Sequence, residues 1–187
     1  RGLLVAVAAG GVLAISGASS VPGLSSAVVD QLTQSFTRID SIQTVIAPGQ
    51  QAVRGVATIQ AVFGYAGLGF ERWNGGAWTR QFGWQDLRRF HFESIGKRWG
   101  AACDVPDLAL FPERYPGVRD VAFHAALELP VQHVALWFAA ALRRLGVPLP
   151  TSRYAAQLDA FSSRFLDRFG SPTGAMQVRV QGLRSNG

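Results

Sequence analysis

The chain has 187 residues, of which 48% are hydrophobic and 16% are charged, and its mean hydropathy is +0.15. This composition excludes intrinsic disorder and supplies enough apolar residues for the core of one substantial domain. The net charge of +6 raises the hypothesis of a nucleic-acid-binding protein. The basic residues are nevertheless spread along the chain without a basic stripe or arm, so we expect a generally basic surface and no nucleic-acid partner.

The chain contains one cysteine, Cys103, which excludes an intramolecular disulfide and a zinc site built from several thiolates. A single cysteine fits a reducing compartment, and we expect a cytoplasmic protein. No histidine lies near Cys103 in the sequence to activate it, so we interpret it as a small buried side chain. The three histidines, His91, His124 and His133, are scattered, and their spacing predicts no metal site.

The first twenty residues raise the question of a targeting or membrane segment. Residues 2–18 are almost entirely apolar, as in a signal peptide or a short membrane span. Three glycines interrupt this stretch, and it falls just short of the length that crosses a bilayer. We prefer a soluble interpretation, in which a helix end at Leu3–Ala9 and a glycine pair precede a buried strand at Val12–Ile15.

The segment from residue 24 to residue 82 alternates between helical and strand patterns. Pro22 stands at the mouth of a predicted helix, where its missing N–H costs nothing. Asn74-Gly75-Gly76 is a strong hairpin signal, because these residues tolerate positive φ. The predicted elements are a helix at Leu24–Phe36, a strand at Arg38–Ile46, a helix at Val53–Tyr65 ending at Gly67, and hairpin strands at Phe70–Trp73 and Ala77–Phe82.

The second half of the chain mixes short strands with two long helices. Its strands are recognised by alternation of apolar and polar residues, and its last helix by an aromatic stripe at helical spacing. The predicted elements are a strand at Arg88–Glu93, a helical turn or two at Asp107–Phe111, a strand at Val121–Leu129, helices at Val131–Gly146 and Ser152–Phe169, and a strand at Met176–Val180. Together these elements predict an α+β fold, with a mixed, largely antiparallel sheet and helices packed on one face.

The small-residue loop before the first long helix is the most informative segment for chemistry. Residues 16–26 read SGASSVPGLSS, and such small residues let a ligand approach the backbone closely. The helix N-terminus beyond the loop would offer free N–H groups to a phosphate or carboxylate. An ordinary serine-capped loop explains the same residues equally well. No G-x-G-x-x-G, Walker A, H-E-x-x-H or G-x-S-x-G motif occurs in the chain.

Several segments carry a resemblance to a known family. The segments GASSVPGLSSAVVD (17–30), IAPGQQAVRGVATIQAVFGYAG (46–67), GWQDL (83–87), RWGAACDVPDLALFPERYPGV (98–118), FHAALEL (123–129) and GAMQVRVQG (174–182) occur in this order. They resemble the part of saccharopine-dehydrogenase-like NAD(P)-dependent oxidoreductases that follows the Rossmann half. Agreement in the same order over nearly the whole chain is more specific than any single motif.

The resemblance implies two structural units. Residues 1–20 would be the last helix and strand of an upstream Rossmann-like domain, and residues 21–187 would form a substrate and oligomerisation domain of the α+β class. The cofactor would be NADP or NAD, bound by a glycine-rich fingerprint that this chain lacks. Ser19, Ser20, Pro22 and Gly23 would lie at the crossover between the domains, near the nicotinamide. The isolated segment is expected to be inactive, and no catalytic acid or base is identified.

Four charged residues are candidate contacts for a small-molecule substrate. Arg98, Asp104 and Asp107 form a polar group, and the segment Asp104-Val105-Pro106-Asp107 lies between hydrophobic elements, so its carboxylates could face a cleft. We favour a structural interpretation, in which Asp107 caps a short helix and Asp104 pairs with an arginine such as Arg98. Arg54, after the APGQQ turn, is a further candidate contact for an anion.

The predicted helix at Val131–Gly146 carries an uninterrupted apolar run at residues 134–142, followed by Arg143 and Arg144. This pattern is compatible with a helix in a membrane interface, and so with a non-catalytic binding module as the alternative function. A core or dimer-interface helix is favoured, because the next predicted helix supplies a matching aromatic stripe. The family resemblance implies a homodimer, and membrane contact is not favoured.

Overall fold

The computed structural model describes residues 19–52, 58, 64–148, 157 and 164–185, and within them the chain forms three α-helices and seven strands. The predicted Rossmann tail lies almost entirely outside the described residues, which take in only Ser19 and Ser20 of it. Most of the two helices predicted at 53–65 and 152–169 also lies outside them. What the structure describes is therefore the sheet, its hairpin and three of the helices.

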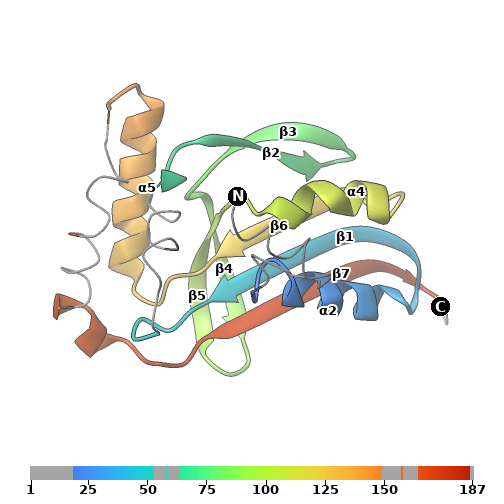
Figure 1. Cartoon of the computed structure of the whole chain (residues 1–187), viewed down its shortest axis with the longest axis horizontal. Coiled ribbons are helices and arrows are strands. Elements are labelled where there is room, and N and C mark those ends of the chain that lie inside the picture. The colour runs from blue at the N-terminus through green and yellow to red at the C-terminus, as the bar shows by residue number, and fades with distance from the viewer. Residues whose placement is uncertain (1–18, 53–57, 59–63, 149–156, 158–163, 186–187) are drawn as a thin grey trace, which may run out of the picture.

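Five strands form one mixed sheet in the order β4-β5-β6-β1-β7 (Figure 1). β1 and β6 pair in parallel, and the other neighbouring pairs are antiparallel. The fold is thus α+β with a largely antiparallel sheet, as the sequence predicts. The strands are β1 Phe36–Ala47, β4 Gln85–Phe92, β5 Gly96–Ala102, β6 Asp120–Ala125 and β7 Ala175–Arg184.

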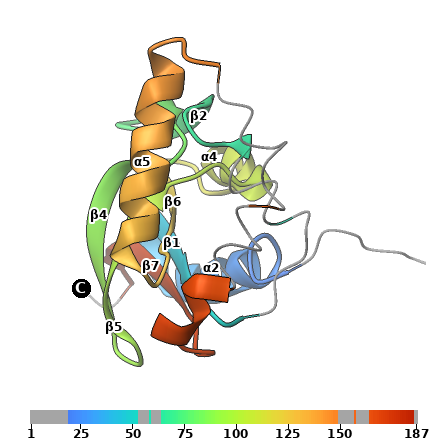
Figure 2. The same cartoon turned by 90° about the vertical axis from the view of Figure 1, so that its left-hand side faces the viewer.

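One face of the sheet is covered by helices. The helix α2 (Leu24–Thr33) and the short α4 (Phe111–Arg114) lie on the same side of the sheet (Figure 2). A core of Val29, Ile42, Leu108, Phe111, Val118, Val121 and Phe123 joins them to β1 and β6. The helix α5 (Pro130–Arg144) buries Leu136 and Ala140 against Ala101 on this same face, because Ala101 pairs with Ala125, which also packs on the α2 side.

The opposite face is concave and closes on itself. Val45 and His124 are neighbours in register and are completely buried there, with Phe90 and Phe92 of β4 beside them. The amide of Gln177 on β7 donates to the carbonyl oxygen of His91 on β4 at 3.3 Å. This bond joins the two edge strands, so the coiled sheet resembles an incomplete barrel.

A separate hairpin of β2 (Gly69–Asn74) and β3 (Ala77–Phe82) stands beside β6. The Nε1 of Trp73 donates to the carbonyl oxygen of Val118 at 2.8 Å, and the backbone N–H of Gly76 donates to Arg119 at 2.9 Å. The turn at Gly75 and Gly76 has φ values of 63° and 83°, as the hairpin signal predicts.

The structure corrects three predicted elements. α2 ends at Thr33 and not at Phe36, because Phe36 already belongs to β1. β5 was not predicted, because Gly96, Lys97 and Gly100 weaken the apolar alternation that identifies strands. β6 ends at Ala125 instead of continuing to Leu129, since Leu129 already serves as the N-terminal cap of α5 before Pro130. The hairpin occurs close to its predicted bounds, and β1 and β7 contain the predicted strands but are longer.

Gly100 tests the packing of the concave face. A Cβ at this position would lie 2.7 Å from the Phe90 ring and 3.4 Å from the Cβ of His124. We expect Gly100→Ala to lower the free energy of unfolding by about 1–3 kcal/mol through overpacking, measured by urea denaturation. Gly64→Ala is the matched control, because a Cβ there meets nothing within 4 Å. Equal stability of the two variants would contradict this account.

Candidate functional site

The loop from Ser19 to Gly23 folds back tightly on the start of α2. The N–H of Ser19 donates to the carbonyl oxygen of Pro22 at 2.7 Å, and the Ser19 hydroxyl donates to the carbonyl oxygen of Val21 at 2.9 Å. Gly23 has a φ of 113°, which a side chain would disfavour. The loop is therefore a compact, preformed structure.

This loop also uses the N–H groups that a helix N-terminus would offer to an anion. The N–H of Leu24 donates to Ser19, and the N–H of Ser25 donates to Ser20, both at 3.0 Å. The expected phosphate cradle is thus already partly satisfied by the protein itself. The loop can therefore contact a ligand through small side chains and backbone atoms, but it offers few free N–H groups to an anion.

Asp107 lies directly beside the start of α2. Its carboxylate accepts hydrogen bonds from the hydroxyls of Ser26, at 2.5 Å, and Ser25, at 3.5 Å. The prediction that Asp107 caps its own short helix is wrong, because the 3-10 helix η1 (Pro106–Leu110) has Val105 at its N-cap and no side-chain capping bond. The structure therefore brings Asp107 together with the serine-rich segment, although 81 residues separate Asp107 from Ser26.

Of the other predicted substrate residues, Arg98 has a partner different from the one expected. Arg98 forms an ion pair with Glu128 at 3.4 Å, and not with Asp104 as the structural interpretation predicted. Asp104 lies two residues after β5 and is exposed overall, but partial desolvation of its carboxyl group raises its pKa above the ordinary value. Arg54 lies outside the described residues.

Glu128, the ion-pair partner of Arg98, has a structural role. Its carboxylate accepts the N–H of Gln50 at 2.7 Å and the N–H of Ser171 at 2.9 Å. Burial alone would raise the pKa of Glu128, but these hydrogen bonds and the charge of Arg98 lower it below its ordinary value. Glu128 thus joins three separate loops, and Arg98 balances its charge.

Cys103 and the two buried histidines lack the properties of catalytic groups. Burial raises the pKa of the Cys103 thiol to about 12, which is the opposite of an activated nucleophile. Burial lowers the pKa of His124 and of His133 to about 4. The Nε2 of His133 accepts the N–H of Leu127 at 2.8 Å, so the neutral ring is part of the fold. Among the described residues, no group of three or more His, Cys, Asp and Glu side chains could hold a metal ion.

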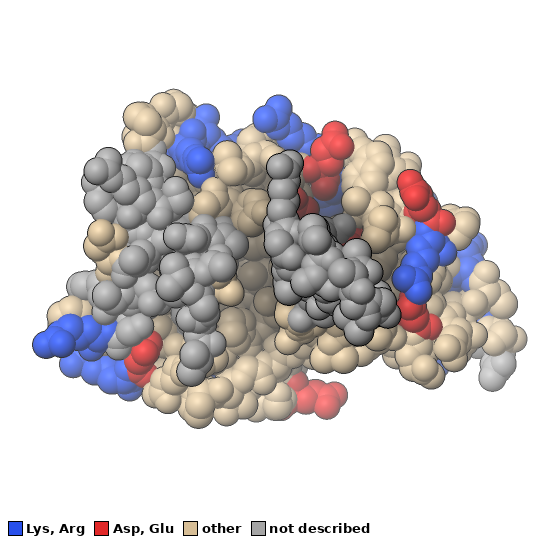
Figure 3. All heavy atoms as spheres, viewed as in Figure 1, with Lys and Arg blue, Asp and Glu red and all other residues tan. Residues whose placement is uncertain are grey.

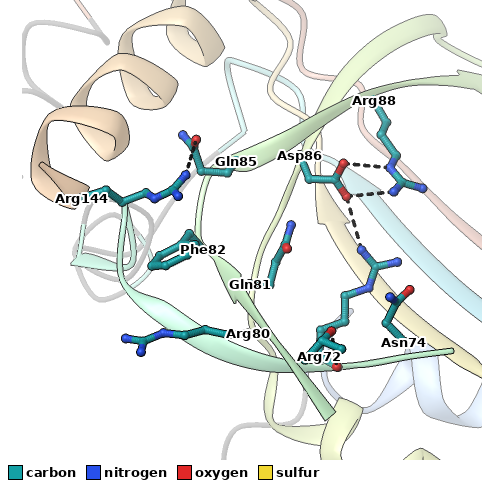
Figure 4. A pocket seen from close by; sticks show the side chains of 10 residues that line it. Arg72, Asn74, Arg80, Gln81, Phe82, Gln85, Asp86, Arg88 and Arg144 are labelled. Carbon is teal, nitrogen blue, oxygen red and sulfur yellow. Dashed lines mark hydrogen bonds and ion pairs between the residues drawn. The ribbon is translucent and has the colours of Figure 1, made fainter. Parts of the chain in front are cut away.

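A second region, which the sequence did not indicate, is a polar pocket of about 550 Å³ between the hairpin, the start of β4 and the end of α5 (Figure 4). Arg72 and Arg88 lie on one side of it around Asp86, and Arg144 lies on the other side beside Gln85. The lining residues are Arg72, Asn74, Thr79, Arg80, Gln81, Phe82, Gln85, Asp86, Arg88 and Arg144.

Asp86 is aimed into this pocket by an irregular backbone. The register between β4 and β5 shifts between Gln85 and Arg88, and both Trp84 and Asp86 have positive φ, at 60° and 53°. Positive φ costs about 1–2 kcal/mol for a residue with a side chain, so the surrounding contacts must hold this conformation. Bulges of this kind redirect side chains at sheet edges and binding sites.

The Asp86 carboxylate is shared by two arginines. It lies 3.1 Å from the guanidinium of Arg88 and 3.3 Å from that of Arg72, and 3.7 Å from the Nε2 of His124. Burial would raise the pKa of Asp86, but its hydrogen bond with Arg88 and the neighbouring positive charges lower it. Burial and the nearby Arg88 lower the pKa of Arg72.

The charged side chains elsewhere do not form one basic stripe on the face seen in Figure 3, where described Lys and Arg side chains stand in several separate groups with Asp and Glu among them. The expectation that the protein has no nucleic-acid partner stays a prediction. Within the described part of the chain, no helix is both long enough and apolar enough to cross a bilayer.

Comparisons with known proteins do not identify the chain. No model of a protein family matches it, and no curated protein matches its sequence. The resemblance to saccharopine-dehydrogenase-like oxidoreductases therefore stays a prediction.

The two buried histidines predict that stability falls in acid. Their pKa is about 4 in the folded protein and about 6.5 when unfolded, so the unfolded chain binds more protons between these values. We expect the free energy of unfolding to be highest above pH 6.5 and to fall as the pH decreases toward 4, by about 3 kcal/mol per histidine.

Urea denaturation at a series of pH values measures this dependence. His133→Gln keeps an acceptor for the Leu127 N–H and should flatten the pH dependence by about half. His91→Gln, which replaces an exposed histidine, is the matched control for the substitution. The account fails if all three proteins lose stability equally between pH 6.5 and pH 4.

Proposed function

We propose that the chain is the substrate-side domain of an NAD(P)-dependent oxidoreductase of the saccharopine-dehydrogenase-like type. The observation that supports the proposal is the preformed loop at Ser19–Gly23, which is closed by its own hydrogen bonds and stands directly beside Asp107. A loop of small residues at the point where an upstream domain would join the sheet is suited to border a cleft between two domains.

In this proposal the two domains of the enzyme contact different parts of the cofactor. An upstream Rossmann domain binds the phosphates of NADP or NAD, and the Ser19–Gly23 loop borders the nicotinamide. The loop's own hydrogen bonds leave it little capacity to bind a phosphate, which agrees with this placement. Asp107, at 9% exposure, holds the loop and α2 in position through Ser26, so it is a positioning residue. We further propose that the protein is cytoplasmic and acts on a small molecule.

The first test of the oxidoreductase proposal uses the full-length protein. We expect the full-length protein to contain a G-x-G-x-x-G unit ahead of this chain and to quench or shift the fluorescence of NADPH or NADH on binding. The described domain expressed alone should leave the fluorescence unchanged. A full-length protein that binds neither nucleotide would overturn the proposal.

Gly23→Ala tests the loop itself within the full-length protein. A side chain at a φ of 113° distorts the loop, and we expect nicotinamide nucleotide binding to weaken about tenfold. Gly117→Ala is the matched control, because Gly117 also has positive φ, at 92°, and lies in the loop before β6. Both variants should lose similar thermal stability. Equal weakening of nucleotide binding in both would show that backbone strain alone is responsible.

The alternative function is a binding or oligomerisation module that acts through α5. Val134 and Phe138 of this helix are 63% and 59% exposed, so the helix presents an apolar face. The two arginines at the end of α5 are directed elsewhere, however. Arg143 donates to the carbonyl oxygens of Gly64 and Ala66, and Arg144 lines the polar pocket, over the ring of Phe82. This argues for contact with a second copy of the chain over contact with anionic lipid.

Phe138→Glu tests self-association through α5. We expect sedimentation to detect a dimer of the wild-type protein and a monomer of the variant, because a buried, unpaired carboxylate opposes association. Leu110→Glu has the same 59% exposure on another element and should leave the dimer intact. A monomeric wild type, or binding of the folded wild type to sedimented lipid vesicles, would count against the dimer.

A further inference from the structure

The pocket between β3, β4 and α5 carries more positive charge than its own acidic residue balances. Four arginines line it, and Asp86 is the one acidic residue among the lining side chains. That carboxylate is already engaged by Arg72 and Arg88. Arg144 contacts neutral groups, the amide oxygen of Gln85 at 3.4 Å and the ring of Phe82 at 4.1 Å. The pocket therefore has a net positive charge at neutral pH.

Arg72 contributes a second, independent observation. Its side chain is only 12% exposed, and its buried Nε has no hydrogen-bond partner among the described residues. A buried guanidinium next to another arginine is energetically unfavourable unless anionic groups compensate both. The carboxylates of Asp86 and Asp120 both favour the charged form of Arg72, yet burial and the charge of Arg88 still lower its pKa.

The arrangement of the side chains suits a ligand between them. Figure 4 shows Arg144 on one side of the pocket, the group of Arg72, Asp86 and Arg88 on the other side, and Gln81 between the two. Arginine donors form planar forks that match the oxygens of phosphate and carboxylate groups. The pocket volume of about 550 Å³ is that of a typical small-molecule site.

We propose that this pocket binds a small, multiply charged anion, which is held between Arg144 and Arg88 and contacts Gln81. This site is separate from the loop at Ser19–Gly23, since Arg72 points away from the helix-covered face on which its neighbour Trp73 packs. The inference does not depend on the oxidoreductase proposal. Two sources share this chemistry, a phosphate group and a polycarboxylate.

Isothermal titration calorimetry of the full-length protein at fixed ionic strength tests the proposal. The probes are inorganic phosphate, citrate and, as a singly charged reference, acetate. We expect phosphate or citrate to bind saturably and acetate to bind at least tenfold more weakly, because the affinity comes from the excess charge. The stronger of the two multivalent probes identifies the ligand class.

Arg144→Ala supplies the decisive comparison. It removes an exposed side chain that contacts Gln85 and Phe82, and we expect the affinity for the multivalent probe to fall about tenfold. Arg89→Ala is the matched control, since Arg89 is also exposed, lies on β4 and stacks on Trp99 at 4.8 Å, outside the pocket. Equal losses in both variants, or no saturable binding by the wild type, would overturn the proposal.

Asp86→Asn gives a readout that a purely structural role would not produce. Asparagine tolerates the positive φ of this position but removes the negative charge from the pocket. We expect the variant to bind the multivalent anion several-fold more tightly than the wild type, although it loses stability. If Asp86 serves only to hold the arginines in place, the affinity would fall instead, and the proposed site would be wrong.

Discussion

The carboxylate of Asp86 attaches the hairpin to the start of β4, while Trp73 and Gly76 attach it to the chain before β6. It accepts charge-assisted bonds from Arg72 of β2 and from Arg88 of β4, and so joins two elements that share no strand pairing. The bond to the exposed Arg88 is screened by solvent, whereas Arg72 is mostly buried and its bond is less screened. The two positive-φ residues around Gln85 are the backbone distortion that places this carboxylate.

The concave face of the sheet buries the histidine that lies beneath Asp86 and its two arginines. Because β4 and β7 approach each other, Phe90 and Phe92 fill the interior and His124 is buried beneath Asp86. A buried histidine with a pKa of about 4 is neutral at physiological pH and adds no third positive charge beneath the two arginines. Burial of the ring thus limits the charge repulsion that Arg72 and Arg88 already generate.

The sequence predicted the elements whose signals are local. The hairpin follows from Asn74-Gly75-Gly76, the strand β7 from its alternation, and α5 from its length between Pro130 and Gly146. β5 escaped prediction because its register is set by β4 and β6 and not by its own glycine-containing pattern. Strand formation there is a tertiary effect, which a single stretch of sequence does not encode.

The two candidate sites also differ in how far local sequence could predict them. The loop at Ser19–Gly23 is a contiguous segment, so its small residues could be recognised in the sequence, whereas its bond from Ser26 to Asp107 required the fold. The arginines of the pocket come from four elements between residues 72 and 144, and no local spacing connects them. Their single sequence signal was the excess of arginine over acidic residues.

The two candidate sites are built on different sets of elements, which the hairpin links. The loop is attached to α2 and, through Asp107, to η1, while the pocket is built on β3, β4 and the end of α5. The hairpin connects both, since Trp73 packs in the core beneath α2 and its neighbour Arg72 reaches Asp86 on the other side. Arg72 and Trp73 therefore hold the hairpin on two sides, Arg72 at the carboxylate of Asp86 in the pocket and Trp73 at the core that supports the loop.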